Sequence, residues 1–180
     1  MINRKIARRY AKALMNIGQV DGNYDTYGKE LETFTSLFQR EEQLREVLNN
    51  PAFGIPRRQA IIKEIGKKLR LNPITVNFLH LLVDKNRIRY LPDIATLYRE
   101  LADEAAGRAR VHLITAHDLS EKKLKELTAG LQGFVGKQVI MEVETDPSLI
   151  GGVVARIGGM VYDGSVKTQL ERLKETLAKG

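Results

Sequence analysis

The sequence contains no cysteine and no tryptophan. Without cysteine there are no disulfide bridges, no thiolate metal ligands and no thiol nucleophile. Long hydrophobic runs are missing too, because the longest spans only a few residues, whereas a membrane-spanning helix needs roughly 20. The charged amino terminus also lacks the apolar segment of a signal peptide. We therefore expect a protein that is soluble or at most peripheral to a membrane.

Motifs for catalysis and for cofactor binding are missing as well. A phosphate-binding loop ends in Gly-Lys-Ser/Thr at the start of a helix, but residues 136–138 read Gly-Lys-Gln, and no G-x-G-x-x-G occurs. No serine lies in a Gly-x-Ser-x-Gly turn. The three histidines have no accompanying carboxylate pair at metal-ligand spacing. The sequence thus predicts no enzyme, no cofactor and no metal site.

Charge leaves one alternative function open. The formal net charge is +7, and basic residues cluster within 4–12 and within 57–70. Such clusters are typical of solvated helix faces, but they also occur in nucleic-acid-binding proteins. Neither cluster lies in a helix-turn-helix, zinc or aromatic-stacking arrangement. A basic helical nucleic-acid-binding protein is therefore the alternative to the interpretation below.

The first part of the chain is a series of amphipathic helices. Turn signals such as Asp21-Gly22-Asn23 and Asn72-Pro73 separate them. The expected helices lie near residues 3–20, 23–40, 42–49, 56–70, 73–86 and 92–106. Short connections favour antiparallel packing of neighbours. The chain is therefore expected to be mainly α, with an antiparallel six-helix bundle as its amino-terminal domain, residues 1–106.

After Gly107 the pattern changes to strands. Residues 111–115 are β-branched and apolar, 139–144 alternate, and 153–162 fit a strand or hairpin that bends at Gly158-Gly159. Ser120 and Ser165 are expected to cap two further helices. Gly151-Gly152 permits close backbone approach or a bulge, and positive φ angles are expected at Gly158-Gly159 and Asp163-Gly164. Residues 107–180 should form a small α/β carboxy-terminal domain.

Two helices carry wider apolar sectors than a surface helix needs. The sector covers roughly 180 degrees in the first helix and roughly 220 degrees in the fifth, against about 100 degrees for an ordinary core stripe. Either both helices are central and fully buried, or their outer edges form a groove for an amphipathic partner helix. The pattern alone leaves both interpretations open.

Several stretches resemble the delta subunit family of F-type ATP synthase, whose mitochondrial counterpart is the oligomycin-sensitivity-conferring protein. The resemblance rests on residues 146–166, DPSLIGGVVARIGGMVYDGSV, followed by Leu170 and Leu173. The opening residues 7–14, ARRYAKAL, and the middle residues 85–87, KNR, followed by Leu91-Pro92, match as well. One departure is Gly159, where the family often has an acidic residue.

This resemblance implies a non-catalytic stator subunit that joins the catalytic alpha/beta ring to the b-type peripheral stalk, so that torque is resisted during proton-driven ATP synthesis. The six-helix bundle would receive the amino-terminal helix of an alpha subunit between its first and fifth helices. The residues expected to line that groove are Ile6, Tyr10, Ala13, Leu14, Phe78, Leu81 and Leu82.

The carboxy-terminal domain would hold the stalk. Its candidate contact residues are Val166, Leu170, Leu173 and Leu177, which are equally compatible with a plain core. The resemblance further implies one copy per complex and a monomer in isolation. Because no transit peptide precedes the first helix, we expect a peripheral protein on the cytoplasmic face of a bacterial membrane, with no nucleic acid or small-molecule substrate as partner.

Overall fold

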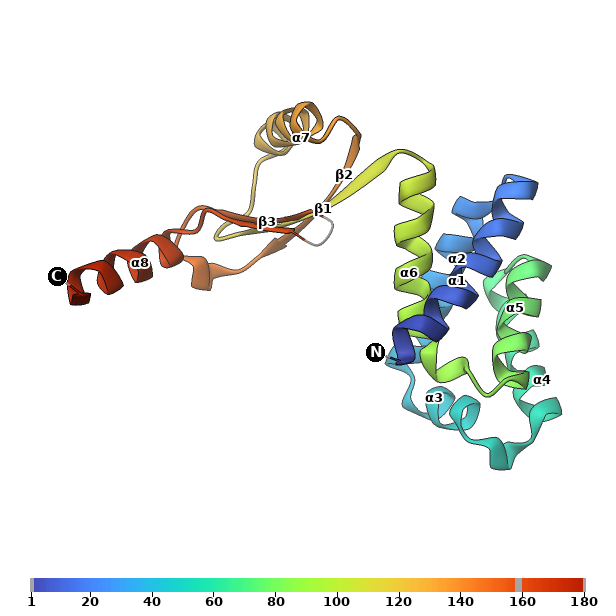
Figure 1. Ribbon diagram of the computed structural model, residues 1–180. Coiled ribbons are helices and arrows are strands. Elements are labelled where there is room, and N and C mark those ends of the chain that lie inside the picture. The colour runs from blue at the N-terminus through green and yellow to red at the C-terminus, as the bar shows by residue number, and fades with distance from the viewer. Residues whose placement is uncertain (1, 158–159, 180) are drawn as a thin grey trace. The chain divides into compact units, whose positions relative to one another are not determined.

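The computed structural model describes residues 2–157 and 160–179 (Figure 1). The chain divides between Ala102 and Asp103 into two compact units, called here the helical unit and the sheet unit. The division lies four residues before the expected boundary at 106–107. The first part is helical and the second mixes helices with one sheet, which confirms the expected fold class at this level.

Helices make up the regular structure of the helical unit. They are α1 (Ile2–Asp21), α2 (Tyr24–Arg40), α3 (Glu42–Asn49), α4 (Ile55–Leu69), α5 (Pro73–Asp84) and α6 (Leu91–Ala105), with 3-10 turns η1 (Pro51–Phe53) and η2 (Ile88–Tyr90). The last three residues of α6 lie beyond the division, in the sheet unit. These bounds agree with the expected ranges to within two residues. The agreement follows from local signals, since Asn72 caps α5 by accepting a hydrogen bond from Ile74 N at 2.9 Å.

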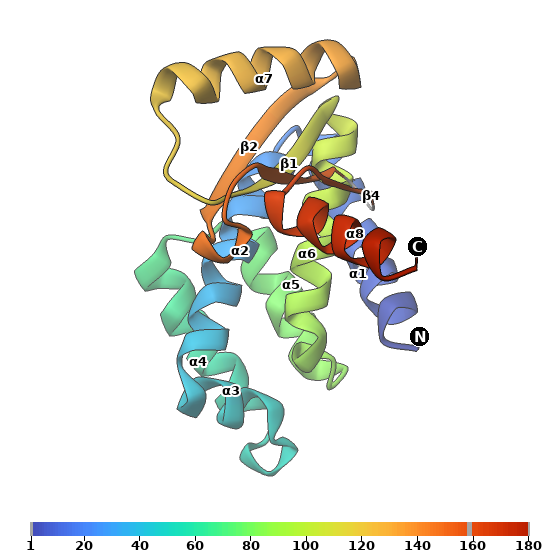
Figure 2. The same ribbon diagram turned by 90° about the vertical axis from the view of Figure 1, so that its left-hand side faces the viewer.

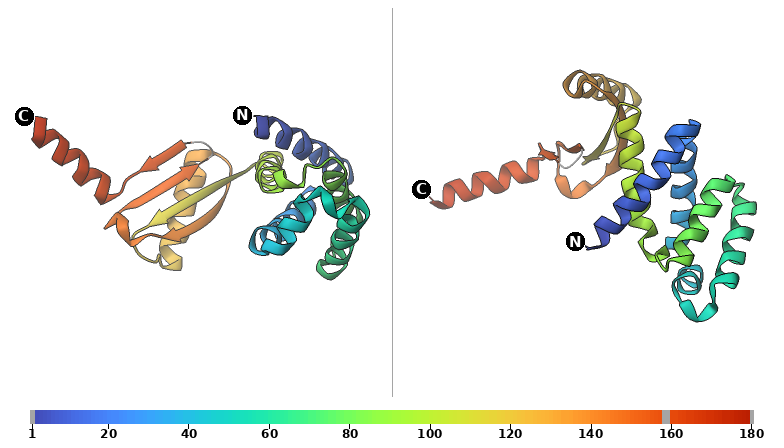
Figure 3. Two further views of the ribbon diagram at one scale, coloured as in Figure 1. Left: turned by 90° about the horizontal axis from the view of Figure 1, so that it is seen from below. Right: turned by 45° about the vertical axis from the view of Figure 1, so that its right-hand side comes forward.

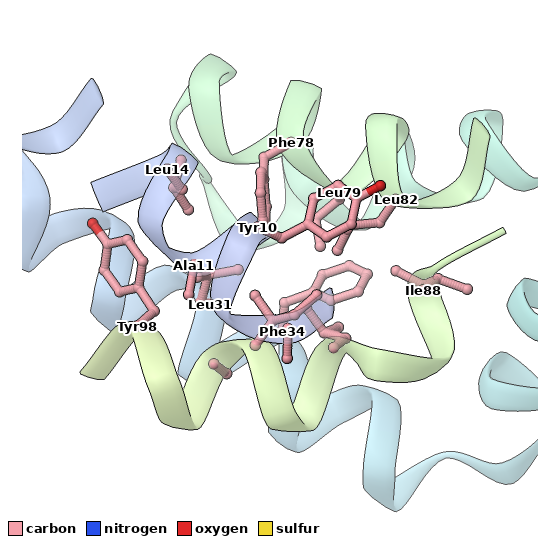
Figure 4. Packing of buried hydrophobic residues seen from close by; sticks show 14 of the residues in the cluster. Tyr10, Ala11, Leu14, Leu31, Phe34, Phe78, Leu79, Leu82, Ile88 and Tyr98 are labelled. Carbon is pink, nitrogen blue, oxygen red and sulfur yellow. The ribbon is translucent and has the colours of Figure 1, made fainter. Parts of the chain in front are cut away.

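The core of the helical unit is built mainly from α1, α2, α5 and α6 (Figure 4). α1 contributes the small side chains Ala7 and Ala11, which are fully buried and allow α1 to lie close to its neighbours. Tyr10 of α1 meets Phe78 of α5 edge to face, with ring centroids 6.4 Å apart and an interplanar angle of 69°. This aromatic pair joins the two helices whose apolar sectors are too wide.

A buried arginine ties three segments of the helical unit together. Arg58 is 2% exposed, and its guanidinium donates to Leu48 O at 3.2 Å, to Gly54 O at 3.3 Å and to Asn86 Oδ1 at 3.1 Å. Asn86 adopts a positive φ of 51°, which presents its side chain to the arginine. Arg58 thus satisfies the carbonyl at the end of α3 and fixes the turn after α5.

The sheet unit contains one four-stranded sheet with one helix against a face. Its elements are β1 (Arg108–Thr115), α7 (Glu121–Val135), β2 (Gln138–Thr145), the 3-10 turn η3 (Pro147–Leu149), β3 (Val153–Ile157), β4 (Met160–Asp163) and α8 (Val166–Lys179). The strand order is β2-β1-β3-β4. β1 and β2 are parallel, and the other pairs are antiparallel. α7 connects the parallel pair and packs along β2 (Figure 2).

The core of the sheet unit is small. Leu127 and Leu131 of α7 pack against the buried residues Val111, Leu113 and Val139. Strands β3 and β4 confirm the expected hairpin, whereas its bend at Gly158-Gly159 lies outside the described residues. A core of this size leaves many apolar side chains of β4 and α8 at the surface.

The glycines around the start of α8 act through close packing. Gly152 has a φ of 77°, and a Cβ there would lie 2.3 Å from the carbonyl oxygen of Gly164. This confirms the expected close approach at Gly151-Gly152. The expectation for Gly164 was wrong, because its φ is not positive. Gly164 contributes its backbone to this contact, because its carbonyl oxygen lies against Gly152 and its amide donates to Val153 O at 2.9 Å.

The role of Arg58 can be tested by substitution. Arg58→Met should lower the free energy of unfolding by about 3 kcal/mol, because buried acceptors lose their donors. The control Arg57→Met removes a neighbouring exposed guanidinium, which lies 5.3 Å from the Phe53 ring centroid, and should cost less than about 1 kcal/mol. Urea denaturation of both variants measures the difference. Equal losses would contradict the structural role given to Arg58.

Candidate functional site

One edge of α1 carries apolar residues that the core does not cover. Ala13 is exposed, Ile17 is 46% exposed and Val20 is 91% exposed. Ile6 is half-buried one turn before Tyr10. These residues follow one another at helical spacing, so they form a continuous stripe beside the buried face of α1.

α5 has a matching edge. Leu81 is 41% exposed and Ile74 is half-buried, and both lie next to Phe78 on the helix surface. Because Phe78 contacts Tyr10, the uncovered edges of α1 and α5 border the same aromatic pair. The helical unit therefore presents a surface with Tyr10 and Phe78 in the middle, the α1 edge on one side and the α5 edge on the other. We call this the α1/α5 surface.

The structure corrects the prediction for two of the seven expected groove residues. Leu14 is 1% exposed and Leu82 is 0% exposed, so both belong to the core and support the α1/α5 surface from beneath. Tyr10 and Phe78, at 9% and 7%, expose only a small part of their rings. Of the expected set, Ile6, Ala13 and Leu81 are the residues with side chains most accessible to a partner.

Three residues of this surface were absent from the expected site: Ile17, Val20 and Ile74. The sequence did contain a signal for them, because Ile17 and Val20 continue the three-and-four spacing of Ile6, Tyr10 and Ala13. Ile74 lies one turn before Phe78 in the same way.

The rim of the α1/α5 surface along α1 is basic. Lys5, Arg9 and Lys12 are all exposed, and the Arg9 guanidinium lies 5.8 Å from the centroid of the Tyr10 ring. These charges are expected to raise the rate of association with an acidic partner and to fix its register.

In the sheet unit, the candidate stalk residues form a stripe on α8. The exposed fractions are 36% for Val166, 52% for Leu170, 56% for Leu173 and 74% for Leu177. The alternative that they form a plain core does not hold in this structure. Figure 3 shows α8 continuing away from the sheet, and its first turn lies against η3 and the preceding loop.

The first turn of α8 is held by a compact set of hydrogen bonds. Ser165, which is 1% exposed, accepts from Thr168 N through its Oγ at 3.3 Å, as expected of a cap. Asp163 Oδ1 accepts from Ser165 N at 2.9 Å, and Val166 N donates to Gly151 O at 2.9 Å. The Ser165 amide, with the hydroxyls of Ser165 and Thr168, holds the pKa of the Asp163 carboxyl below its usual range.

The sequence matches the family model described as ATP synthase delta (OSCP) subunit over residues 6–177. The chain belongs to this family. Curated delta subunits are similar to this chain over all or nearly all of their lengths. The ATP synthase subunit delta of Desulfatibacillum aliphaticivorans is 44% identical over 179 residues, covering 99% of this chain and 98% of that protein. The subunit of Geobacter sp. (strain M21) is 43% identical over 180 residues, covering 100% of both.

The fold is also that of a known ATP synthase chain. A chain in the mitochondrial ATP synthase hexamer of Toxoplasma gondii superimposes with a TM-score of 0.73 at 24% sequence identity, covering 96% of this chain and 97% of that one. As a member of the delta family, the protein is a structural, non-catalytic subunit in the peripheral stalk of F-type ATP synthase. Membership of this family decides against the alternative interpretation of the chain as a basic helical nucleic-acid-binding protein.

The described part of the chain has no group of three or more histidine, cysteine, aspartate or glutamate side chains that could hold a metal ion. His112 instead pairs across the parallel strands with Glu144, Nε2 to Oε2 at 3.2 Å. Among residues 2–157 and 160–179, every helix is too short or too polar to cross a bilayer.

The depressed pKa of Asp163 predicts a pH dependence at the start of α8. Because the folded pKa is below the unfolded value of about 3.9, the stabilisation is present above that value and is lost as the pH falls through the folded pKa. Amide exchange at Ser165 and Thr168 should accelerate in that acidic range, as measured by NMR. In Asp163→Asn this pH dependence should disappear. Unchanged acid sensitivity in that variant would assign the effect to another group.

Proposed function

We propose that this delta subunit is a clamp between the catalytic ring and the peripheral stalk. The helical unit, as an antiparallel six-helix bundle, would bind the amino-terminal helix of an alpha subunit, and the sheet unit would bind the b-type stalk. The observation that carries the proposal is the pair of uncovered apolar edges beside Tyr10 and Phe78.

A helix is the occupant that suits the α1/α5 surface best. Exposed Ala13 has no bulky side chain, so a partner backbone can approach α1 closely there, while Ile17 and Leu81 supply larger contacts on either side. A partner helix with apolar residues at three-and-four spacing would cover both edges at once. Affinity would come mainly from the central residues, which lose contact with water most completely.

The stalk contact is proposed for α8, because its stripe is the longest exposed apolar series among the described residues of the sheet unit. A partner there would be bound far along the helix from the sheet. Binding of ring and stalk through separate units of one chain would keep the ring from turning with the central shaft. We further propose one copy per complex, a monomer in isolation, and a site on the cytoplasmic face of a bacterial membrane.

The ring contact is tested by calorimetric titration with a peptide of about 20 residues from the amino terminus of the alpha subunit of the same complex. Leu81→Asp should weaken binding at least roughly 30-fold, because it places a charge on the α5 edge, next to Phe78, where an apolar partner side chain would lie. Val143→Asp is the matched control, since Val143 is 42% exposed and lies in the sheet unit. Absence of heat with the folded wild type would refute this docking site.

The stalk contact is tested with the soluble part of the b-type stalk subunits. Leu173→Asp should remove most of the binding while leaving the alpha peptide titration unchanged, because the substitution lies in α8 and the peptide binds the helical unit. Sedimentation of the mixed proteins measures stalk binding, and the calorimetric titration described above measures binding of the alpha peptide. Loss of alpha peptide binding in Leu173→Asp, or undiminished stalk binding, would argue against the division of roles between the units.

A further inference from the structure

The exposed stripe of α8 has the spacing of a coiled-coil seam. Its members, Val166, Leu170, Leu173 and Leu177, follow at intervals of four, three and four residues. This is the alternation of a and d positions in a heptad, with an average period of 3.5 residues. The stripe covers only roughly 60 degrees of the helix, which is narrower than the sector of a helix that packs on a sheet.

The residues beside this seam differ in charge between its two flanks. In the heptad register with Leu170 and Leu177 at a, the two e positions are lysines, Lys167 and Lys174. The g positions are the uncharged Gln169 and Thr176. All four side chains are exposed. In coiled coils these flanking positions face the partner and determine which partner is accepted.

The acidic residues of α8 lie away from the seam. Glu171 and Glu175 occupy the b and f positions, on the opposite side of the helix. They are exposed and take no part in the flanks. The surface that a partner would meet is therefore apolar in the middle and positive on one side.

We propose that α8 is one strand of a short, two-heptad coiled coil. Its partner is a helix with an apolar a/d seam and with acidic residues opposite Lys167 and Lys174. The inference rests on the proposed stalk role of the sheet unit and states the chemistry of the stalk segment that binds there. The pairing would be left-handed, with the helices nearly aligned rather than crossing steeply.

A second copy of this chain is a poor partner for the same seam. In an antiparallel pair the e positions face each other, which sets lysine against lysine. In a parallel pair each lysine lies beside Gln169 or Thr176, so no opposite charges meet. An acidic helix of another protein gains attraction in either direction, and charge complementarity therefore favours it.

A membrane surface is likewise a poor occupant. Helices that lie in a bilayer interface bury a broad apolar face. α8 offers only a single row of four apolar side chains, which is much narrower than such a face. A helix of this length is also marginal without packing partners, and the hydrogen bonds that tie α8 to the sheet unit lie at its first turn. A pairing helix supplies the missing packing.

The test uses the full-length protein and two synthetic three-heptad peptides with leucine at a and d. One peptide has glutamate at all e and g positions and the other has lysine. Calorimetry at low salt should detect binding of the acidic peptide, with a preference of roughly fivefold or more over the basic one. The variant with both Lys167→Glu and Lys174→Glu should reverse that preference. Leu173→Asp should abolish binding of either peptide.

The control variant carries Lys122→Glu and Lys125→Glu on α7, whose side chains are exposed in the same unit. It makes the same change in net charge and should leave the preference for the acidic peptide intact. If it reverses the preference as well, the selection comes from net charge, and the proposed seam is wrong.

Other outcomes overturn the inference in distinct ways. Equal binding of both peptides, or binding that survives Leu173→Asp, would remove the charged seam as the site. Dimerisation of the protein through Leu173, or Leu173-dependent binding to phosphatidylglycerol vesicles, would identify a different occupant. If the soluble stalk binds through Leu173 but the acidic peptide does not, the stalk role stands and the acidic-partner inference fails. If only the acidic peptide binds, the stalk role alone is contradicted.

Discussion

The edge-to-face contact between Tyr10 and Phe78 is the interaction around which the α1/α5 surface is arranged. It joins α1 to α5 where both helices have more apolar surface than the core can cover. Ala7, Ala11, Leu14 and Leu82 belong to the core, and Tyr10 and Phe78 are only 9% and 7% exposed, so the apolar surface left to the solvent is on their outer side, along the α1 and α5 edges. The free energy gained by covering that side is available only to a binding partner.

The sheet unit also leaves apolar surface uncovered, but for a different structural reason. Its sheet has one packed helix and a small core, and the loop at Gly151-Gly152 fits so closely against Gly164 that the direction of α8 is fixed at its first turn. Beyond Val166, which lies against Gly151, the apolar row of α8 is more than half exposed, at 52% for Leu170, 56% for Leu173 and 74% for Leu177. For a subunit whose activity is to hold two other components together, such uncovered surfaces are the functional parts.

Local signals allowed the helices to be predicted, because caps such as Asn72 and Ser165 act within a few residues. The burial of individual side chains could not be predicted in the same way. Leu14 and Ile17 lie one turn apart on α1, yet Leu14 is in the core and Ile17 is exposed, since the rotation of α1 is set by the helices around it. Likewise β1 begins at Arg108, in a polar stretch, because parallel pairing with β2 extends it.

The most direct test of the account is whether one chain holds both partners at the same time. The protein would be saturated with the alpha-subunit peptide and then titrated with the soluble stalk, with the mass of the complex followed by sedimentation. The account predicts a ternary complex and a stalk affinity unchanged by the peptide, because the two surfaces lie on separate units. Displacement of the peptide by the stalk would show that the two share one site, and would contradict the clamp.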